Sequence, residues 1–221
     1  YSKEVALKRV TDDKNRAKIW RELYWEVVKL ESFPFFESFL IFMEHKRPYE
    51  KRFYEPRAKT LKIVVDDLQR LEDSKTQKML TESLPSRTGK STLMVFFGDW
   101  IELRHPESHN AMCTHSGFLA DHFYKEMLET MTSPEYCYEE LYTFFNPDKK
   151  FIEDKSAEKM TISLVSKGDF PTFTFRGIDG TWTGAIDISS DGYLFIDDLV
   201  RDRTHSLSPR RMDDTFSEYL N

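Results

Sequence analysis

The most informative stretch of the sequence is Leu84-Pro85-Ser86-Arg87-Thr88-Gly89-Lys90-Ser91. It follows a candidate strand at 79–84 and opens a candidate helix at 91–103, which is the context that a phosphate-binding loop requires. Glycine at 89 lets the backbone approach the phosphates, and N–H groups at the helix start attract the anion. In such a loop, Lys90 reaches the β- and γ-phosphates and the Ser91 hydroxyl binds Mg²⁺.

The loop departs from the usual pattern at its first position, because Leu84 stands where glycine is common. A chance Gly-Lys-Ser at the start of a helix therefore remains an alternative for this motif taken alone.

An acidic strand end lies far downstream of the loop. Residues 193–196 form an apolar run typical of a buried strand, and Asp197 and Asp198 follow it. Open α/β sheets bind ligands at the carboxyl ends of their strands, so both carboxylates are expected near the phosphates. Asp197 is the candidate Mg²⁺ ligand, and Asp198 is the candidate for polarising the attacking water. A strand followed by a solvated acidic turn is the alternative.

A glycine-rich loop precedes the acidic strand. Gly177, Gly180 and Gly184 make residues 176–184 a flexible connection. Arg176, at its start, is a candidate contact to the γ-phosphate in its own or a neighbouring subunit. A surface turn with a solvated arginine is equally compatible with this stretch.

The rest of the chain alternates between helix and strand patterns after an all-helical beginning. Helices are expected at 12–30, 34–44, 58–72, 117–132 and 134–144, and strands at 110–114, 160–165, 172–175 and 193–196. This alternation predicts an α/β fold with a mainly parallel central sheet flanked by helices. We expect an N-terminal helical segment at 1–57 and a core at 58–221.

Composition narrows the function classes. The 221 residues are 39% hydrophobic and 32% charged, which is typical of a folded domain. The net charge of −6 argues against a protein that binds nucleic acid over its whole surface.

Other classes of site and location are also limited by the sequence. Two cysteines make no disulfide framework and favour an intracellular setting. No apolar run approaches the roughly 20 residues that cross a membrane. The histidines show no zinc-binding spacing, so no transition-metal site is expected.

Four motifs in sequence resemble one known family, the large terminase subunits of tailed phages. Residues 85–91 resemble its Pro-Pro-Arg-His-Gly-Lys-Ser form of the Walker A motif, and residues 114–120 resemble its strand-to-helix step. Residues 180–184 resemble its Gly-x-x-Thr-Gly loop. Residues 196–202 resemble its Walker B region, with Leu199 in place of proline. The resemblance covers roughly residues 35–221.

The resemblance implies a P-loop NTPase fold of the ASCE type and a motor that uses ATP and Mg²⁺ to drive double-stranded viral DNA into a procapsid. Such motors form homo-oligomeric rings with a portal protein and a small terminase subunit in the host cytoplasm. The residues implied for nucleotide binding are Pro85, Ser86, Arg87, Thr88, Gly89, Lys90 and Ser91. Asp197 would hold Mg²⁺, Asp198 would be the catalytic carboxylate, and Arg87 would stabilise the γ-phosphate.

The resemblance also places an adenine contact upstream of the loop. Phe53 or Tyr54 would stack on the base, and Arg57 would add a polar contact. The alternative is that these aromatic side chains cap the N-terminal helices.

The family's coupling motif and nuclease domain would lie beyond Asn221, so we expect no nuclease activity from this chain and weak ATPase activity. Basic stretches at 201–203 and 209–211 are candidate DNA contacts, with a salt-bridged surface as the alternative. Three other functions stay open: a helicase-like ATPase, which needs a second lobe, a small-molecule kinase, and a nucleotide-binding module that assembles the ring with little hydrolysis of its own.

Overall fold

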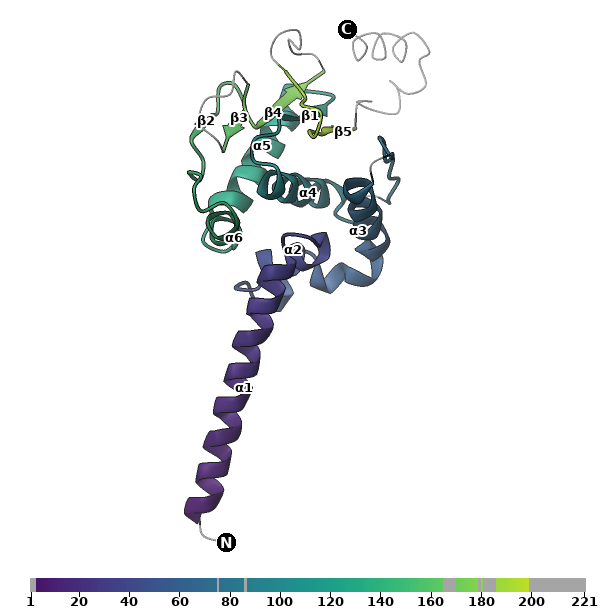
Figure 1. Ribbon diagram of the computed structural model, residues 1–221. Coiled ribbons are helices and arrows are strands. Elements are labelled where there is room, and N and C mark those ends of the chain that lie inside the picture. The colour runs from purple at the N-terminus through teal and green to yellow at the C-terminus, as the bar shows by residue number, and fades with distance from the viewer. Residues whose placement is uncertain are drawn as a thin grey trace. The chain divides into compact units, whose positions relative to one another are not determined.

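The computed structural model describes residues 3–74, 76–85, 87–164, 170–178, 180 and 186–198, with side chains from residue 13 onward. The chain divides into two compact units, residues 1–80 and residues 81–221 (Figure 1). Several expectations fall outside the described residues: the position of Ser86, the loop at 181–184, residues 199–202 and the basic stretches at 201–203 and 209–211.

The first unit is helical, as the sequence predicted. Its elements are α1 (Lys3–Glu31), α2 (Phe36–Met43), the short 3₁₀ helices η1 (Tyr49–Lys51) and η2 (Glu55–Arg57), and α3 (Ala58–Asp73). The apolar residues Phe39 and Leu40 of α2 and Leu61 of α3 are buried between the helices. Gln69 fastens α3 to the start of α2, because its Oε1 accepts a 2.7 Å bond from the Phe36 N–H. The unit extends to Leu80, beyond the expected boundary after residue 57.

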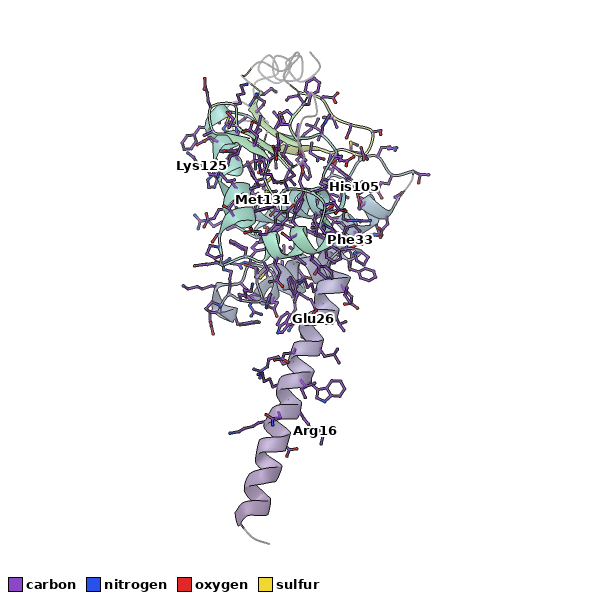
Figure 2. All side chains as sticks on the ribbon, turned by 60° about the vertical axis from the view of Figure 1, so that its left-hand side comes forward. Arg16, Glu26, Phe33, His105, Lys125 and Met131 are labelled. Carbon is purple, nitrogen blue, oxygen red and sulfur yellow. The ribbon has the colours of Figure 1, made fainter. Side chains whose placement is uncertain are left out.

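Helix α1 is longer than the expected 12–30. Only its C-terminal part packs on the rest of the unit, through the buried Val28 and the half-buried Trp25, whose ring lies 4.7 Å from that of His45. Figure 2 shows Arg16 on the part of α1 that extends beyond the other helices of this unit.

The second unit is an α/β domain. Its helices are α4 (Lys90–Arg104), α5 (Gly117–Thr132) and α6 (Tyr138–Phe145). Its strands are β1 (Asn110–Thr114), β2 (Asp154–Ser156), β3 (Thr161–Ser163), β4 (Phe173–Gly177) and β5 (Leu194–Asp197). They form one open sheet in the order β2-β3-β4-β1-β5. The α/β class and most predicted elements are confirmed, and the expected bounds of β1 and α5 are unchanged.

The sheet is mixed, so the expected mainly parallel arrangement is wrong. Strand β1 pairs in parallel with β4 and β5, whereas β3 pairs antiparallel with both β2 and β4. The reason lies in the connections: only residues 157–160 join β2 to β3 and only 164–172 join β3 to β4. Parallel neighbours need a crossover of a dozen or more residues, which these links are too short to supply.

The strand expected at 79–84 does not form. These residues have no regular structure, and Met79 is 78% exposed. A strand is stabilised by hydrogen bonds to a neighbour and by burial of side chains on it. Nothing in the described part of the chain pairs with this segment, so its apolar residues lack the partner that their pattern requires.

Helix α4 is the centre of the second unit. Every residue from Val95 to Leu103 is buried. Gly98 permits the close contact with α5, because a Cβ at this position would come within 2.6 Å of Met127 Cε. The buried stretch nevertheless includes two carboxylic acids, Asp99 and Glu102. Glu102 accepts a 2.8 Å bond from Asn110 Nδ2, but neither Asp99 oxygen has a hydrogen-bond partner among the described residues.

Replacing Asp99 with asparagine should flatten the pH dependence of stability. Burial raises the pKa of Asp99 well above its usual range, so the folded protein keeps a proton that the unfolded chain releases near pH 4. Above that pH the free energy of unfolding then falls by up to about 1.4 kcal/mol per pH unit for this group. Chemical denaturation of both proteins at pH 5 and pH 8 checks this.

The asparagine variant should gain stability relative to the parent at pH 8 more than at pH 5. If the free energies of unfolding of the variant and the parent differ by the same amount at pH 5 and at pH 8, Asp99 does not carry the proton. Burial also raises the pKa of Glu102. Because both proteins keep this residue, it adds the same pH dependence of stability to both.

Candidate functional site

The loop before α4 turns sharply at its glycine. Gly89 has φ 95°, in the left-handed region that favours glycine, and forms the N-cap of α4. Its carbonyl accepts the first helical bond, 2.9 Å from the Leu93 nitrogen. Upstream, the Thr88 hydroxyl donates to the Pro85 carbonyl over 2.8 Å and closes the turn. The turn aims the N–H groups at the start of α4 away from the helix, where an anion can accept their bonds.

The ends of β1 and β5 lie beside this helix start. The two strands are parallel, and their last paired residues are Thr114 and Asp197. Asp197 is buried, with 6% of its surface exposed. Asp198 follows with φ 46° and leaves the direction of the strand. Consecutive strand residues normally face opposite sides, so this turn is what allows both carboxylates to reach the same lysine.

Lys90 and Ser91 meet the two aspartates. The Lys90 Nζ lies 3.3 Å from Asp197 Oδ1 and 3.1 Å from Asp198 Oδ1. The Ser91 hydroxyl donates to Asp197 Oδ2 over 3.0 Å. The hydrogen bond to Asp198 raises the pKa of Lys90, with a smaller contribution from Asp197, so the ammonium remains charged. The structure therefore joins segments more than a hundred residues apart in one cluster with a cation, a hydroxyl and two carboxylates.

A further contact fixes the backbone of this cluster. His115 Nδ1 lies 3.0 Å from the Asp198 carbonyl oxygen, at the edge of the sheet that carries Thr114. From sequence, His115 was expected only as part of the strand-to-helix step at 114–120, and its contact with the Asp198 backbone was not predicted. The sequence feature that could have indicated this contact is the position of His115 directly after β1, because β1 and β5 are parallel and end at the same edge of the sheet.

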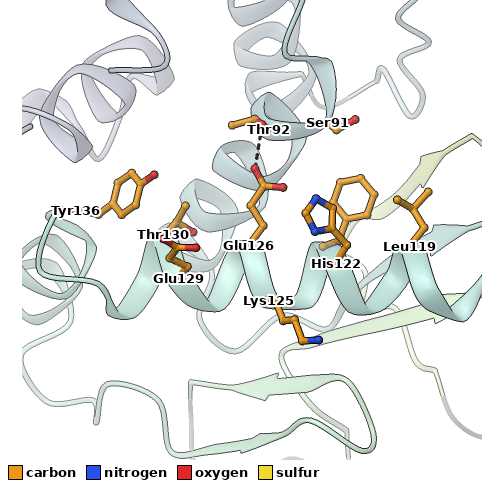
Figure 3. Close-up of a pocket in the computed structure, with 10 residues that line it drawn as sticks. Ser91, Thr92, Leu119, His122, Lys125, Glu126, Glu129, Thr130 and Tyr136 are labelled. Atoms are coloured by element: carbon orange, nitrogen blue, oxygen red, sulfur yellow. Dashed lines mark hydrogen bonds between the residues drawn. The ribbon is translucent and has the colours of Figure 1, made fainter. Parts of the chain in front are cut away.

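A pocket of about 480 Å³ adjoins the cluster between α4 and α5 (Figure 3). Ser91 and Thr92 line it from α4, and Glu126 and Glu129 line it from α5. The Thr92 hydroxyl donates to Glu126 Oε1 over 2.9 Å, shown by the dashed line in Figure 3. This bond ties the first turn of α4, and with it the loop, to α5.

The ion pairs of the two aspartates in the described part of the chain are with Lys90 and not with either predicted arginine. Arg176 donates to the carbonyls of Lys159 and Phe175, and its guanidinium is partly buried. Arg87 has φ 65° in the loop and is exposed. Its role at the γ-phosphate stays a prediction.

Of the three residues predicted to contact adenine, one is excluded. Tyr54 is buried, with 1% of its surface exposed, and its hydroxyl donates to Glu37 Oε1 over 2.6 Å. Its ring is part of the N-terminal core and has no free face for a base, so that assignment is wrong. Phe53 and Arg57 contact each other, with the guanidinium carbon 5.6 Å from the ring centroid. Their role at a nucleotide stays a prediction.

The cluster suits Mg²⁺ better than a transition metal. Among the described residues no group of three histidine, cysteine or acidic side chains is placed to hold a metal ion. Ser91 Oγ and the Asp197 carboxylate are hard oxygen donors 3.0 Å apart. Mg²⁺ is usually bound by one or two carboxylates together with substrate phosphates and water, so these donors fit it when a phosphate is present.

No protein-family model, curated protein or solved structure matches this chain. No described helix combines the length and apolarity that crossing a bilayer requires.

Proposed function

We propose that this chain is the ATPase unit of a viral DNA-packaging motor, with a P-loop NTPase fold, which hydrolyses ATP to move double-stranded DNA into a procapsid. One observation carries the nucleotide part of the proposal: the Ser91 hydroxyl bonds to Asp197 while Lys90 spans both aspartates. A lysine and a hydroxyl at a helix start, facing a carboxylate at a strand end, are the groups that hold a magnesium-bound triphosphate.

The ion pairs of Lys90 suggest how the site responds to its substrate. Without phosphate, the ammonium neutralises Asp197 and Asp198. A bound triphosphate accepts bonds from the N–H groups at the start of α4 and draws Lys90 toward its terminal phosphates. Asp198, released from the lysine and 61% exposed, then accepts a hydrogen bond from a water and orients it toward the γ-phosphate.

Ser91 and Asp197 would hold Mg²⁺ in this site. The ion neutralises charge on the phosphate oxygens when bound. The buried position of Asp197 fixes its carboxylate at the end of β5, and the Thr92–Glu126 bond keeps the adjacent turn of α4 in place.

The packaging part of the proposal rests on the four motifs and their order. In this proposal the chain forms a homo-oligomeric ring, its partners are a portal protein and a small terminase subunit, and it acts in the host cytoplasm. Because the net charge is −6, DNA would be held by a local patch or by a lining that several subunits share.

One observation favours a second candidate, a nucleotide-binding module that assembles the ring with little hydrolysis of its own. Arg176, one of the two arginines predicted to reach the γ-phosphate, donates hydrogen bonds to two backbone carbonyls. Such a module would bind ATP at the same cluster and assemble the ring without hydrolysing ATP on its own.

The test is ATP hydrolysis by this chain with Mg²⁺, with and without double-stranded DNA, over a range of protein concentrations. The packaging motor predicts hydrolysis that DNA stimulates and whose rate per subunit rises with association. A hydrolysis rate that DNA does not change would contradict the motor but would still agree with an ATPase. Tight ATP binding without turnover at any concentration would favour the assembly module.

A further inference from the structure

Helix α1 carries a row of apolar side chains that its own unit leaves exposed. They recur at spacings of three and four residues, which places them on one face of a helix. These residues are Trp20 (67% exposed), Leu23 (50%), Tyr24 (53%), Val27 (45%) and Leu30 (56%). The residues that pack on the unit, Trp25 and Val28, lie beside this row, and the Tyr24 ring contacts the Trp25 ring with 5.0 Å between the centroids. The exposed row therefore extends the apolar surface of α1 beyond the residues that pack.

Charged residues continue this face at both ends. Arg16 lies four residues before Trp20, Glu31 lies four residues after Val27, and Asp13 lies on the same face three residues before Arg16. Arg16 and Glu31 are both exposed, and Glu31 Oε2 accepts a long bond of 3.4 Å from the Ser38 hydroxyl. Figure 2 shows Arg16 on the extended part of α1.

The charges select the orientation of a partner helix. In a parallel pair of identical helices, Arg16 would face Arg16 and Glu31 would face Glu31, which is repulsive at both ends. In an antiparallel pair, Arg16 of each copy meets Glu31 of the other, while Trp20 meets Val27 in the apolar centre. An isolated helix of this length gains little stability in water without packing on its apolar face.

We infer that α1 pairs antiparallel with α1 of a second copy of this chain, through the face that Trp20, Leu23, Tyr24, Val27 and Leu30 form. The pairing uses the same surface on both copies, so it closes at two. It does not rest on the proposed ATPase activity, because no residue of this face belongs to the nucleotide site.

Cysteine cross-linking tests the orientation directly. A mixture of Arg16→Cys chains and Glu31→Cys chains should form covalent heterodimers under mild oxidation, while each variant alone should not. Such a heterodimer keeps one Arg16–Glu31 pair at the end opposite the disulfide. The native thiols Cys113 and Cys137 are buried and do not compete.

Charge reversal tests the affinity. Arg16→Glu alone should weaken dimerisation roughly tenfold in sedimentation equilibrium, and adding Glu31→Arg should restore it. Trp20→Ser should leave a monomer with unchanged ATP binding. A parent that stays monomeric at all concentrations overturns the inference, and so do covalent dimers formed by the single-cysteine variants, because they indicate parallel helices.

Discussion

Replacing Lys90 with alanine should lower ATP hydrolysis by roughly 10²–10³-fold, the loss that follows removal of a preorganised charged contact to the reacting group. The Lys90 ammonium lies 3.1 and 3.3 Å from the aspartates and is the cation at the start of α4. Without it, a triphosphate would enter next to two unneutralised carboxylates. We therefore expect ATP binding to be lost as well, measured by titration with a fluorescent ATP analogue.

The matched control for Lys90→Ala is Lys150→Ala. Lys150 is a lysine of the same unit that pairs with Glu153 on the surface, and its side chain is 68% exposed. Its loss should leave binding and turnover unchanged. Circular dichroism of both variants separates a lost contact from a lost fold. If the Lys90→Ala variant and the parent bind ATP with equal affinity, this loop is not the nucleotide site.

The second large effect is expected at Asp198. Its replacement by asparagine should reduce turnover roughly 10²–10⁴-fold, because an amide cannot accept a proton from the attacking water as a carboxylate does. Binding of ATP should persist, because Lys90 and the N–H groups at the start of α4, which would hold the phosphates, are unchanged. The backbone at this position should also persist, because His115 bonds to the Asp198 carbonyl and not to the side chain. Single-turnover hydrolysis beside an affinity measurement checks both statements.

A comparison with Asp197→Asn sharpens this result. Asp197 accepts the Ser91 hydroxyl and is the expected Mg²⁺ ligand, so its variant should lose affinity for the magnesium-bound nucleotide as well as turnover. Identical behaviour of the two variants would mean that the aspartates do not divide the roles of metal ligand and catalytic carboxylate. An Asp198→Asn variant with parental turnover would exclude Asp198 as the catalytic group.

Local sequence signals were sufficient for several elements. Strand β1 and helix α5 have the expected bounds because their signals are local: five residues that can all be buried, followed by Ser116, whose hydroxyl caps the helix by accepting the Leu119 N–H. The proximity of Lys90 and Ser91 to Asp197 also agrees with the expectation from sequence. The rule that strand ends gather at one edge of a sheet applies here to β5 alone, because the strand expected before the loop, at 79–84, does not form.

The failures share a different cause. The pattern at 79–84 is that of a strand, but a strand forms only where a neighbour pairs with it. Tyr54 has the composition of a base-stacking residue, but its ring is buried and its hydroxyl is bound to Glu37 on another helix. Asp99 and Glu102 are charged in the sequence, and nothing local shows that they lie inside the domain.

The sequence by itself determined the helical start, the α/β alternation, the sharp turn at Gly89 and the identity of the groups that meet near it. These features depend on backbone preference and on spacing along the chain, which neighbouring residues dictate. Only the tertiary structure decided that the sheet is mixed, that His115 holds the Asp198 backbone and that α1 keeps an uncovered apolar face. Those features depend on which distant segments come into contact, and the free energy of such contacts is not encoded in any one stretch of sequence.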